Sequence, residues 1–380
     1  MTMKIIIAID SFKGSLTSLE AGSAAAIGVK NFLPDAEVKI YPLADGGEGT
    51  CRTLTEGLGG QMKSVEVLNP LGEKIFAELG EIPQKNLAVI EMASAAGLNL
   101  VPKNLRNPLN TTTFGVGEII LSAIRDGYRN FIIGIGGSAT NDCGLGMLTA
   151  LGFKFFDAEN NLCGIFGRDL KNVVAIKIDE VPAEIFDCKF KIACDVKNPL
   201  TGESGCSKIY GPQKGATDEI VQNMDGWIKN FFELTLKTVP CPLPAVRYTE
   251  GDGAAGGWGF AFRTFLRGEL LPGVNLILDA LNIADDLKNA NILITGEGSI
   301  DSQTLQGKAP AGVAKLAKKL NPKIKVVAIG GAVQNIGGNS EIDATFSILR
   351  KPISLDEAMK KNIAQENISA EVEQIIRLLV

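Results

Sequence analysis

The chain has 380 residues, of which 45% are hydrophobic and 21% charged, and its formal net charge is −5. This balance excludes a disordered chain and, without a long basic block, argues against nucleic acid as the main ligand. The absence of histidine excludes histidine-ligated zinc sites, Ser-His-Asp hydrolysis and histidine general bases, which leaves Asp, Glu, Lys, Tyr or Cys for proton transfer.

Two further features limit the class of protein. No run of about 18 apolar residues is present, so we expect no membrane-spanning helix and no membrane partner. The seven cysteines are scattered without a C-x-x-C pair, which indicates reduced thiols and a cytoplasmic protein.

Glycine is in excess, with 43 residues gathered in short loops after apolar runs, where the backbone can approach a ligand closely.

The first elements form a βαβ unit. The apolar, β-branched run Lys4–Ile9 predicts a buried strand, the alanine-rich segment Ser18–Phe32 a helix, and Val38–Leu43 the next strand. Such a unit implies a parallel sheet with helices on its faces.

The rest of the chain continues the alternation. Near the C-terminus we expect a strand, a helix and a strand at Asn291–Thr295, Ala311–Leu320 and Lys325–Ile329. The middle is less regular, and its predicted strands are Val65–Leu68, Phe76–Leu79, Leu87–Glu91, Asn130–Ile135 and Lys189–Cys194.

These elements predict an α/β protein of two domains. A parallel, doubly wound (Rossmann- or flavodoxin-like) sheet domain is built from residues 1–64 and 285–380, and a second α/β domain, residues 65–284, is inserted in it. Ligands of open α/β sheets bind at the carboxyl ends of the strands, so the loops there are the candidate functional residues.

The first two loops carry acidic and basic groups. Lys13, in the loop after the first strand, can reach a phosphate or a carboxylate near a helix N-terminus, although a solvated lysine at an ordinary helix start is equally compatible. In the second loop, Asp45 and Glu48 flank Gly46 and Gly47. Two carboxylates on a glycine turn can hold Mg²⁺ directly or through water.

The third loop, GIGGSATNDCG, begins at Gly134 and has two interpretations. It matches G-x-G-x-x-A after a strand, with Asp157 about 20 residues on, which is the fingerprint of dinucleotide binding. Against this, the loop is rich in polar groups and its helix begins only near Gly144. Hydroxyl and amide donors in such a loop also suit phosphate or substrate oxygens.

Three more loops carry candidate groups. Asp195 follows a predicted strand and is a candidate general base or metal ligand, with Lys214 further on as an anion contact. A glycine-rich segment around Asp252 leaves the backbone open to a ligand, or is a tightly packed helix start. The segment Thr295–Asp301 places two carboxylates on a glycine turn near Lys308, which suits charge neutralisation in phosphoryl transfer.

Taken together, these loops resemble a known family. The segments IDSFKGSLTSLEA, LADGGEGT, NTTTFGVGEII, GIGGSATNDCGLGM, CDVKNPLTG, YGPQKGA, GDGAAGGWG and TGEGSIDSQTLQGKAP are similar to those of the bacterial type I glycerate kinases, the glycerate 2-kinases. The resemblance runs from about Lys4 to Gly331. It departs at Trp258, where a small or aliphatic residue is expected.

The resemblance implies two α/β domains with a cleft between them, and ATP, Mg²⁺ and D-glycerate as ligands. The expected product is 2-phosphoglycerate, and 3-phosphoglycerate is the alternative. We expect Asp195 as the base, Lys13 on the transferred phosphate or the glycerate carboxylate, and Asp45, Glu48 and Asp252 as metal or hydroxyl contacts. The remaining expected substrate and nucleotide contacts are Asp10, Ser11, Gly46, Gly47, Ser138, Asn141, Asp142, Asn198, Lys214, Gly253, Glu297, Ser299, Asp301 and Lys308.

Two other functions use the same loops. An NAD-dependent dehydrogenase rests on Gly134–Ala139 with Asp157, and a non-enzymatic nucleotide or sugar-acid binding protein needs only the glycine loops. The surplus of Asp and Lys disfavours the second, because binding alone needs fewer titratable groups. We expect a monomer or a homodimer.

Overall fold

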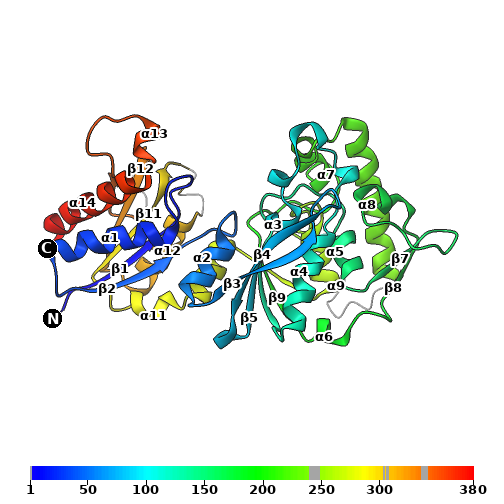
Figure 1. The fold of residues 1–380 in the computed structure, drawn as a ribbon, viewed down its shortest axis with the longest axis horizontal. Helices are drawn as coiled ribbons and strands as arrows, with labels where there is room; N and C mark the ends of the chain where they lie inside the picture. The colour runs from blue at the N-terminus through cyan, green and yellow to red at the C-terminus, as the bar shows by residue number, and fades with distance from the viewer. Residues whose placement is uncertain (1, 239–248, 303, 305–307, 335–340) are drawn as a thin grey trace. The chain divides into compact units, whose positions relative to one another are not determined.

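The computed structural model describes residues 2–238, 249–302, 304, 308–334 and 341–380, and most of its strands belong to two sheets (Figure 1). The strands are β1 Lys4–Ile9, β2 Glu37–Pro42, β3 Gln61–Leu68, β4 Lys74–Ile82, β5 Leu87–Glu91, β6 Asn130–Gly134, β7 Lys154–Phe156, β8 Ala175–Lys177, β9 Lys189–Ala193, β10 Glu269–Leu271, β11 Ile292–Ile300, β12 Lys325–Val333 and β13 Ala344–Ser347.

Helices alternate with these strands through much of the chain. They are α1 Ser18–Phe32, α2 Thr50–Gly57, α3 Ala93–Ala96, α4 Phe114–Arg125, α5 Leu145–Ala150, α6 Ala183–Phe186, α7 Cys206–Tyr210, α8 Asp218–Thr238, α9 Trp258–Phe265, α10 Gly273–Ala280, α11 Ile283–Leu287, α12 Ala309–Leu320, α13 Leu355–Ala358 and α14 Lys361–Leu379.

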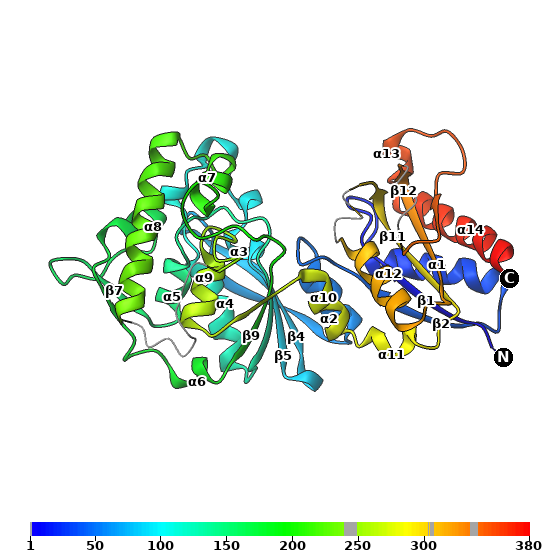
Figure 2. The ribbon, with the colours of Figure 1, turned by 180° about the vertical axis from the view of Figure 1, so that it is seen from behind.

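The chain forms two compact units, and both chain ends belong to the first. This unit comprises Met1–Asp45, Arg52–Leu58 and Val274–Val380. Its sheet is entirely parallel, in the order β13-β12-β11-β1-β2. Helices α1 and α14 cover one face of this sheet (Figure 1), and α12 is in front when the molecule is seen from behind (Figure 2).

Strand β1 shows why its sequence is apolar without alternation. Ile5, Ile7 and Ile9 pack in the cluster formed with α1 and α14, whereas Ile6 and Ala8 point to the other face and are equally buried. A central parallel strand covered by helices on both faces needs a continuous apolar run.

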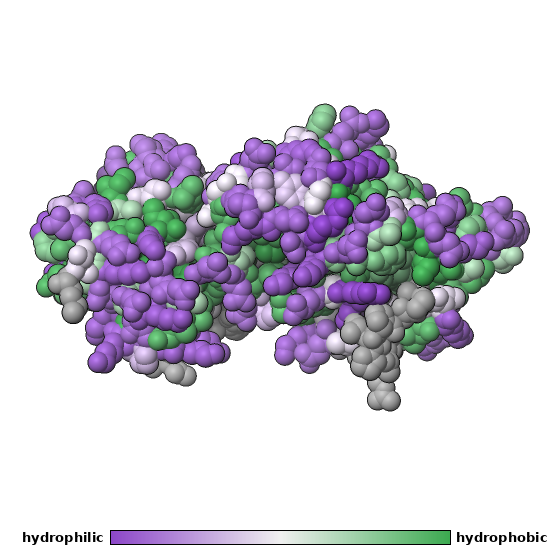
Figure 3. Space-filling view, turned by 90° about the horizontal axis from the view of Figure 1, so that it is seen from below, coloured by the Kyte–Doolittle hydropathy of each residue, from purple (hydrophilic) through white to green (hydrophobic). Residues whose placement is uncertain are grey.

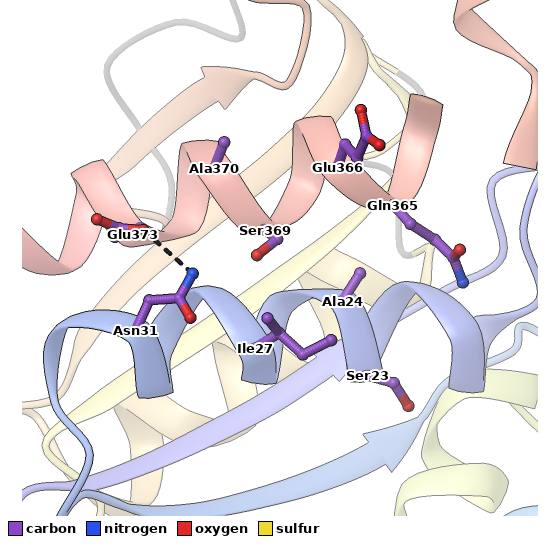
Figure 4. Close-up of a pocket in the computed structure, with 9 residues that line it drawn as sticks. All are labelled: Ser23, Ala24, Ile27, Asn31, Gln365, Glu366, Ser369, Ala370 and Glu373. Carbon is purple, nitrogen blue, oxygen red and sulfur yellow. Dashed lines mark hydrogen bonds between the residues drawn. The ribbon is translucent and has the colours of Figure 1, made fainter. Parts of the chain in front are cut away.

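Helices α1 and α14 pack closely on one another. A Cβ on Gly28 would lie 2.2 Å from the Ser369 carbonyl oxygen, and Asn31 Nδ2 donates to Glu373 Oε2 at 3.2 Å (Figure 4). The shallow groove above this contact contains none of the predicted site residues. It is lined by Ser23, Ala24, Ile27, Asn31, Gln365, Glu366, Ser369, Ala370 and Glu373.

The second unit, Gly46–Cys51 with Gly59–Gly273, holds a mixed sheet. Its strand order is β10-β9-β6-β5-β4-β3. The first four strands are mutually parallel, and β4 and β3 continue antiparallel.

The sequence places domain borders at 64/65 and 284/285, and those borders stay predictions. Strand β3 lies wholly in the second unit, and nearly all of α10 lies in the first.

Most predicted elements are confirmed, and β1, α1 and β5 have the predicted bounds. The expected glycine turn at Thr295–Asp301 is wrong, because β11 continues to Ile300 and pairs with a similarly extended β12. Glycine permits this extension: a Cβ on Gly296 would lie 2.3 Å from the Ile329 carbonyl oxygen. Close packing of β11 on β12 therefore explains why position 296 is glycine, although the sequence suggested a turn there.

One face of the molecule is mainly polar. On the face shown in Figure 3, hydrophilic residues predominate and hydrophobic ones lie in separate patches. Among the described helices, none has the length and apolar character needed to cross a bilayer. The six cysteines within the described ranges are free thiols.

A pair of helical glycines tests the packing. A Cβ on Gly115 would lie 1.9 Å from the Leu68 carbonyl oxygen, whereas a Cβ on Gly226 would meet no atom within 4 Å. We expect Gly115→Ala to lower the free energy of unfolding by about 1–3 kcal/mol through overpacking. Gly226→Ala should raise it by up to about 1 kcal/mol through helix propensity. Urea titration measures both, and an unchanged midpoint for Gly115→Ala would contradict the contact between α4 and β3.

Candidate active site

Three carboxylates gather at the strand ends of the first unit. Asp10 follows β1, Asp45 follows β2, and Glu297 lies in the extension of β11. These strands are neighbours, with β1 in the middle, and Asp10 N donates to the Gly296 carbonyl oxygen at 2.8 Å. The backbone therefore brings all three carboxylates to the same edge, as expected for the carboxyl ends of parallel strands.

Asp10 titrates far from its ordinary range. Burial of its carboxyl raises its pKa most, and the charges of Asp45 and Glu297 raise it further, to about 7. The Ser11 amide, which donates to Asp10 Oδ1 at 2.6 Å, opposes this shift. Like charges in a buried site favour the protonated form, and a bound cation would favour the ionised one.

A residue that the sequence analysis missed fixes two of these loops. Ser18 Oγ donates to the Ile9 carbonyl oxygen and accepts from Leu43 N at 2.8 Å. It is buried at the start of α1 and joins the ends of β1 and β2. Asp10 directly follows one of these ends and Asp45 closely follows the other, so Ser18 helps to set their separation.

Glu297 has partners on its other side. Thr304 Oγ1 donates to Glu297 Oε1 at 2.8 Å, and Lys308 Nζ lies 3.4 Å from Glu297 Oε2. Asp301 accepts from Thr304 N, and Ser299 lies on β11. The structure thus brings four predicted residues together around Thr304, while Gln303 and Gly307 of that motif lie outside the described residues. Lys13 is exposed, three residues after Asp10.

The second unit has its own strand-end site, built on Glu91 at the end of β5. Its carboxylate accepts from Gly49 N at 2.7 Å and from Cys51 N at 3.4 Å, at the start of α2. Burial raises the Glu91 pKa most, these amides lower it, and the charge of Glu48 raises it. The sequence analysis treated Glu91 only as the end of a strand, although a carboxylate suits a helix start.

The loop that Glu91 holds lies against the ends of β6 and β9. A Cβ on Gly134 would lie 2.6 Å from the Gly46 carbonyl oxygen, and one on Gly46 would lie 2.7 Å from Ala193 Cβ. Asp195, exposed just beyond β9, accepts from Gly273 N at 2.9 Å. The two glycines are therefore required for close approach of backbones.

The loop after β6 has one exposed end and one buried end. Gly136 and Gly137 are exposed, and Ser138 beneath them accepts a hydrogen bond from the fully buried Lys214 Nζ at 2.7 Å. Asn141 is also buried and donates to Ser207 Oγ at 2.8 Å. Of the predicted residues on this loop, Ser138 is thus the one nearest the surface.

Asp142 secures the buried end of that loop. It is fully buried and accepts from Thr113 N, from Thr113 Oγ1 at 2.6 Å, and from the amides of Gly144 and Gly146. Burial raises its pKa, and these donors lower it. Asp142 therefore shapes the loop rather than facing a ligand. Its partner Thr113 belongs to the NTTTFG motif, so that motif has a structural role here.

The glycine-rich segment around Asp252 is packed in the interior. Both Asp252 oxygens accept from Arg263, at 2.7–2.9 Å, and Thr249 N also donates to Oδ2 at 2.7 Å. A Cβ on Gly253 would lie 2.2 Å from the Pro199 carbonyl oxygen. Asn198 accepts from Tyr210 at 2.6 Å. These contacts fit the tightly packed helix start, and a buried ion pair leaves a metal little access to Asp252.

Metal binding by protein side chains alone is not supported. Within the part of the chain that the structure describes, no group of three or more Cys, Asp or Glu side chains is arranged to hold a metal ion. Mg²⁺ commonly takes one or two carboxylates and completes its shell with phosphate oxygens and water. The carboxylates beside Asp10 fit that pattern.

The dinucleotide-binding interpretation does not hold. Strand β6, which precedes the glycine loop, has β5 and β9 as its neighbours in the sheet. The strand before Asp157 is β7, which pairs with β8 in a separate two-stranded sheet. In a dinucleotide site that acidic residue follows the adjacent parallel strand, so Asp157 is in the wrong place.

Comparisons with known proteins agree with the motifs. A sequence model described as the Glycerate kinase family matches residues 5–380. The chain belongs to the glycerate kinase family. It is 42% identical to the glycerate 2-kinase of Escherichia coli K12, over 97% of each chain, and 41% identical to a glycerate kinase of Haemophilus influenzae, over 99% of each.

A solved structure supports the same assignment. A protein from Salmonella typhimurium LT2, assigned as glycerate kinase 2, matches with a TM-score of 0.91 and 40% identity over 100% of this chain and 98% of its own. The chain is therefore an enzyme of the glycerate kinase family, a kinase and a transferase, with the family's α/β fold. The family resemblance seen in the sequence is confirmed.

The carboxylate cluster of this glycerate kinase gives a pH prediction. The Asp10 pKa is higher in the folded chain than in the unfolded chain, so ionisation of Asp10 destabilises the fold. This destabilisation is complete above pH 7 and decreases as the pH falls toward 4. Without metal, we expect Asp10→Asn to raise the free energy of unfolding by about 2–4 kcal/mol at pH 8 and by little at pH 4. Urea titration in chelator measures this, with Asp35→Asn, an exposed aspartate of the same unit, as control. An equal gain at both pH values would contradict the cluster.

Glu91 gives a second prediction. In Glu91→Gln one acceptor oxygen becomes an NH₂ group that faces a backbone donor, so the Gly46–Cys51 segment should loosen. We expect faster amide exchange at Gly49 and Cys51 and a kcat/KM reduced at least about tenfold. The exposed Glu184→Gln should change neither. Unchanged exchange at both amides would show that Glu91 does not hold the loop.

Proposed function

We propose that the chain transfers the γ-phosphoryl group of ATP directly to the 2-hydroxyl of D-glycerate, giving 2-phosphoglycerate and ADP. The observation that carries the proposal is the set of carboxylates and lysines at the strand ends of both units, in a family whose Escherichia coli relative is named glycerate 2-kinase. Phosphoryl transfer relies on positioning and on charge stabilisation, which these groups supply without histidine.

The first unit suits the nucleotide. Asp45 would hold Mg²⁺ together with phosphate oxygens. The metal contact expected of Glu48, which belongs to the second unit, stays a prediction. When bound, the ion neutralises charge on the phosphates. Lys13 would contact the transferred phosphoryl group. Asp10, Ser11, Glu297, Ser299, Asp301 and Lys308 would complete the nucleotide site. Asp252, held by Arg263, is left out of the metal set.

Asp195 is proposed as the base for the acceptor. The 2-hydroxyl oxygen of glycerate forms a bond to the γ-phosphorus, the bond from phosphorus to the ADP oxygen breaks, and the hydroxyl proton passes to the Asp195 carboxylate. The hydrogen bond from Gly273 N orients this exposed carboxylate. Gly46, Gly47 and Ser138 would line the acceptor site. Lys214, Asn141, Asp142, Asn198 and Gly253 would support it from behind.

ADP release tests the function. With ATP and Mg²⁺, we expect ADP formation that depends on D-glycerate and stops when a chelator removes the metal. ADP formation at the same rate without glycerate would reject the proposal, because hydrolysis of ATP would then explain the activity.

The base assignment has its own test. We expect Asp195→Asn to lower kcat/KM for D-glycerate at least about tenfold, mostly through kcat. Asp187→Asn, an exposed aspartate of the same unit, should leave both constants unchanged. A loss smaller than tenfold in Asp195→Asn would remove Asp195 from the role of base.

A further inference from the structure

Lys214 is a buried ammonium whose two acceptors carry no charge. Its side chain is 2% exposed, and its Nζ donates to Ser138 Oγ at 2.7 Å and to the Thr140 carbonyl oxygen at 2.6 Å. Burial lowers its pKa to about 8. The nearby carboxylate of Asp142 is engaged by Thr113. Burying a cation against neutral acceptors is costly unless its charge is used elsewhere.

The contact with Lys214 sets the direction of the Ser138 hydroxyl. An ammonium group only donates, so Ser138 Oγ must act as the acceptor in this bond. The hydroxyl hydrogen of Ser138 is thereby left to donate to another group. Ser138 is 7% exposed and lies directly after the exposed Gly136 and Gly137, so a ligand oxygen at this turn can accept that hydrogen.

The turn that carries Ser138 is held firmly from one side. Leu98 N donates to the Gly137 carbonyl oxygen at 2.8 Å, and Ala139 N donates to the Ala96 carbonyl oxygen at 2.9 Å. Gly137 has a φ of +74°, which an L-residue with a side chain adopts rarely. Within the described residues, the amides of Gly136 and Gly137 donate to no acceptor. Exposed amides of this kind in a turn suit an anion.

We propose that the Gly136–Ser138 turn, with the Lys214 ammonium behind it, binds the carboxylate of the sugar-acid substrate. The inference rests on the proposed function and assigns the carboxylate end of the acceptor to this turn. Lys214 is a positioning residue that acts through Ser138.

The surrounding charges favour a carboxylate over nucleotide phosphates. A Cβ on Gly136 would lie 3.5 Å from Gly47 Cα, so the loop that carries Glu48 adjoins this turn, and Glu91 holds that loop. One buried cation beside two carboxylates suits a ligand with a single negative charge. The several charges of a triphosphate would be repelled more strongly.

Substrate discrimination tests the proposal. The wild-type enzyme should prefer D-glycerate to its amide, glyceramide, in kcat/KM. In Ser138→Ala and Lys214→Met this preference should fall about tenfold to a hundredfold, because the carboxylate of glycerate loses a charge-assisted hydrogen bond, whereas the neutral amide loses only a weaker, uncharged one. The KM for ATP should stay unchanged. Lys208→Met, an exposed lysine on the neighbouring α7, is the matched control and should behave as wild type.

The outcomes separate the possible errors. If kcat/KM falls by the same factor for glycerate and for glyceramide, Ser138 and Lys214 have a merely structural role, and the inference is overturned. A raised KM for ATP with unchanged glycerate constants would assign the turn to nucleotide phosphate and also overturn it. If Lys214→Met does not fold, Ser138→Ala decides alone, because it removes only the hydroxyl. A wild-type enzyme that phosphorylates neither acid nor amide would refute the proposed function instead.

Discussion

Partial burial of Asp10 beside the carboxylates of Asp45 and Glu297 is the constraint on which the proposed nucleotide edge of the first unit depends. Three adjacent parallel strands bring these groups together. Desolvation of the partly buried Asp10, reinforced by the charges of Asp45 and Glu297, raises its pKa to about 7. Such an arrangement is unfavourable for the folded chain alone and becomes favourable when a cation joins it. The carboxylates thus lower the free energy of unfolding of the metal-free chain at the place where the nucleotide and its metal are proposed to bind.

The second unit holds its strand-end loops with groups of both charges. Its strand-end loops approach one another so closely that Gly46 and Gly134 must lack side chains. A partly buried carboxylate, Glu91, fixes one loop, and a buried ammonium, Lys214, supports another. Both charges act through neighbours, Glu91 through backbone amides and Lys214 through the Ser138 hydroxyl. The groups proposed to meet substrate are therefore oriented by charges that solvent screens only weakly.

The sequence was a good guide to elements and a poorer one to roles. The continuous apolar run Lys4–Ile9 identified β1, and the alanine content of Ser18–Phe32 identified α1, because burial on both faces and helix propensity act locally. Glycine was ambiguous: Gly296 and Gly253 serve packing against distant carbonyl oxygens, which no local pattern reveals. Asp252 resembled a ligand until its partner Arg263, 11 residues away, was located. Ser18 and Glu91 escaped notice because their partners are backbone groups of other segments: the ends of β1 and β2 for Ser18, and the start of α2 for Glu91.

The central claim is direct phosphoryl transfer from ATP to the 2-hydroxyl of D-glycerate, and phosphorus NMR of the reaction mixture tests it most directly. The enzyme with ATP, Mg²⁺ and D-glycerate should produce ADP and one new phosphomonoester signal. Coupling of that signal to a single methine proton would identify 2-phosphoglycerate, as the account predicts. Coupling to a methylene pair would identify the 3-phosphate and contradict the proposed acceptor. Inorganic phosphate as the sole product would contradict the transfer itself.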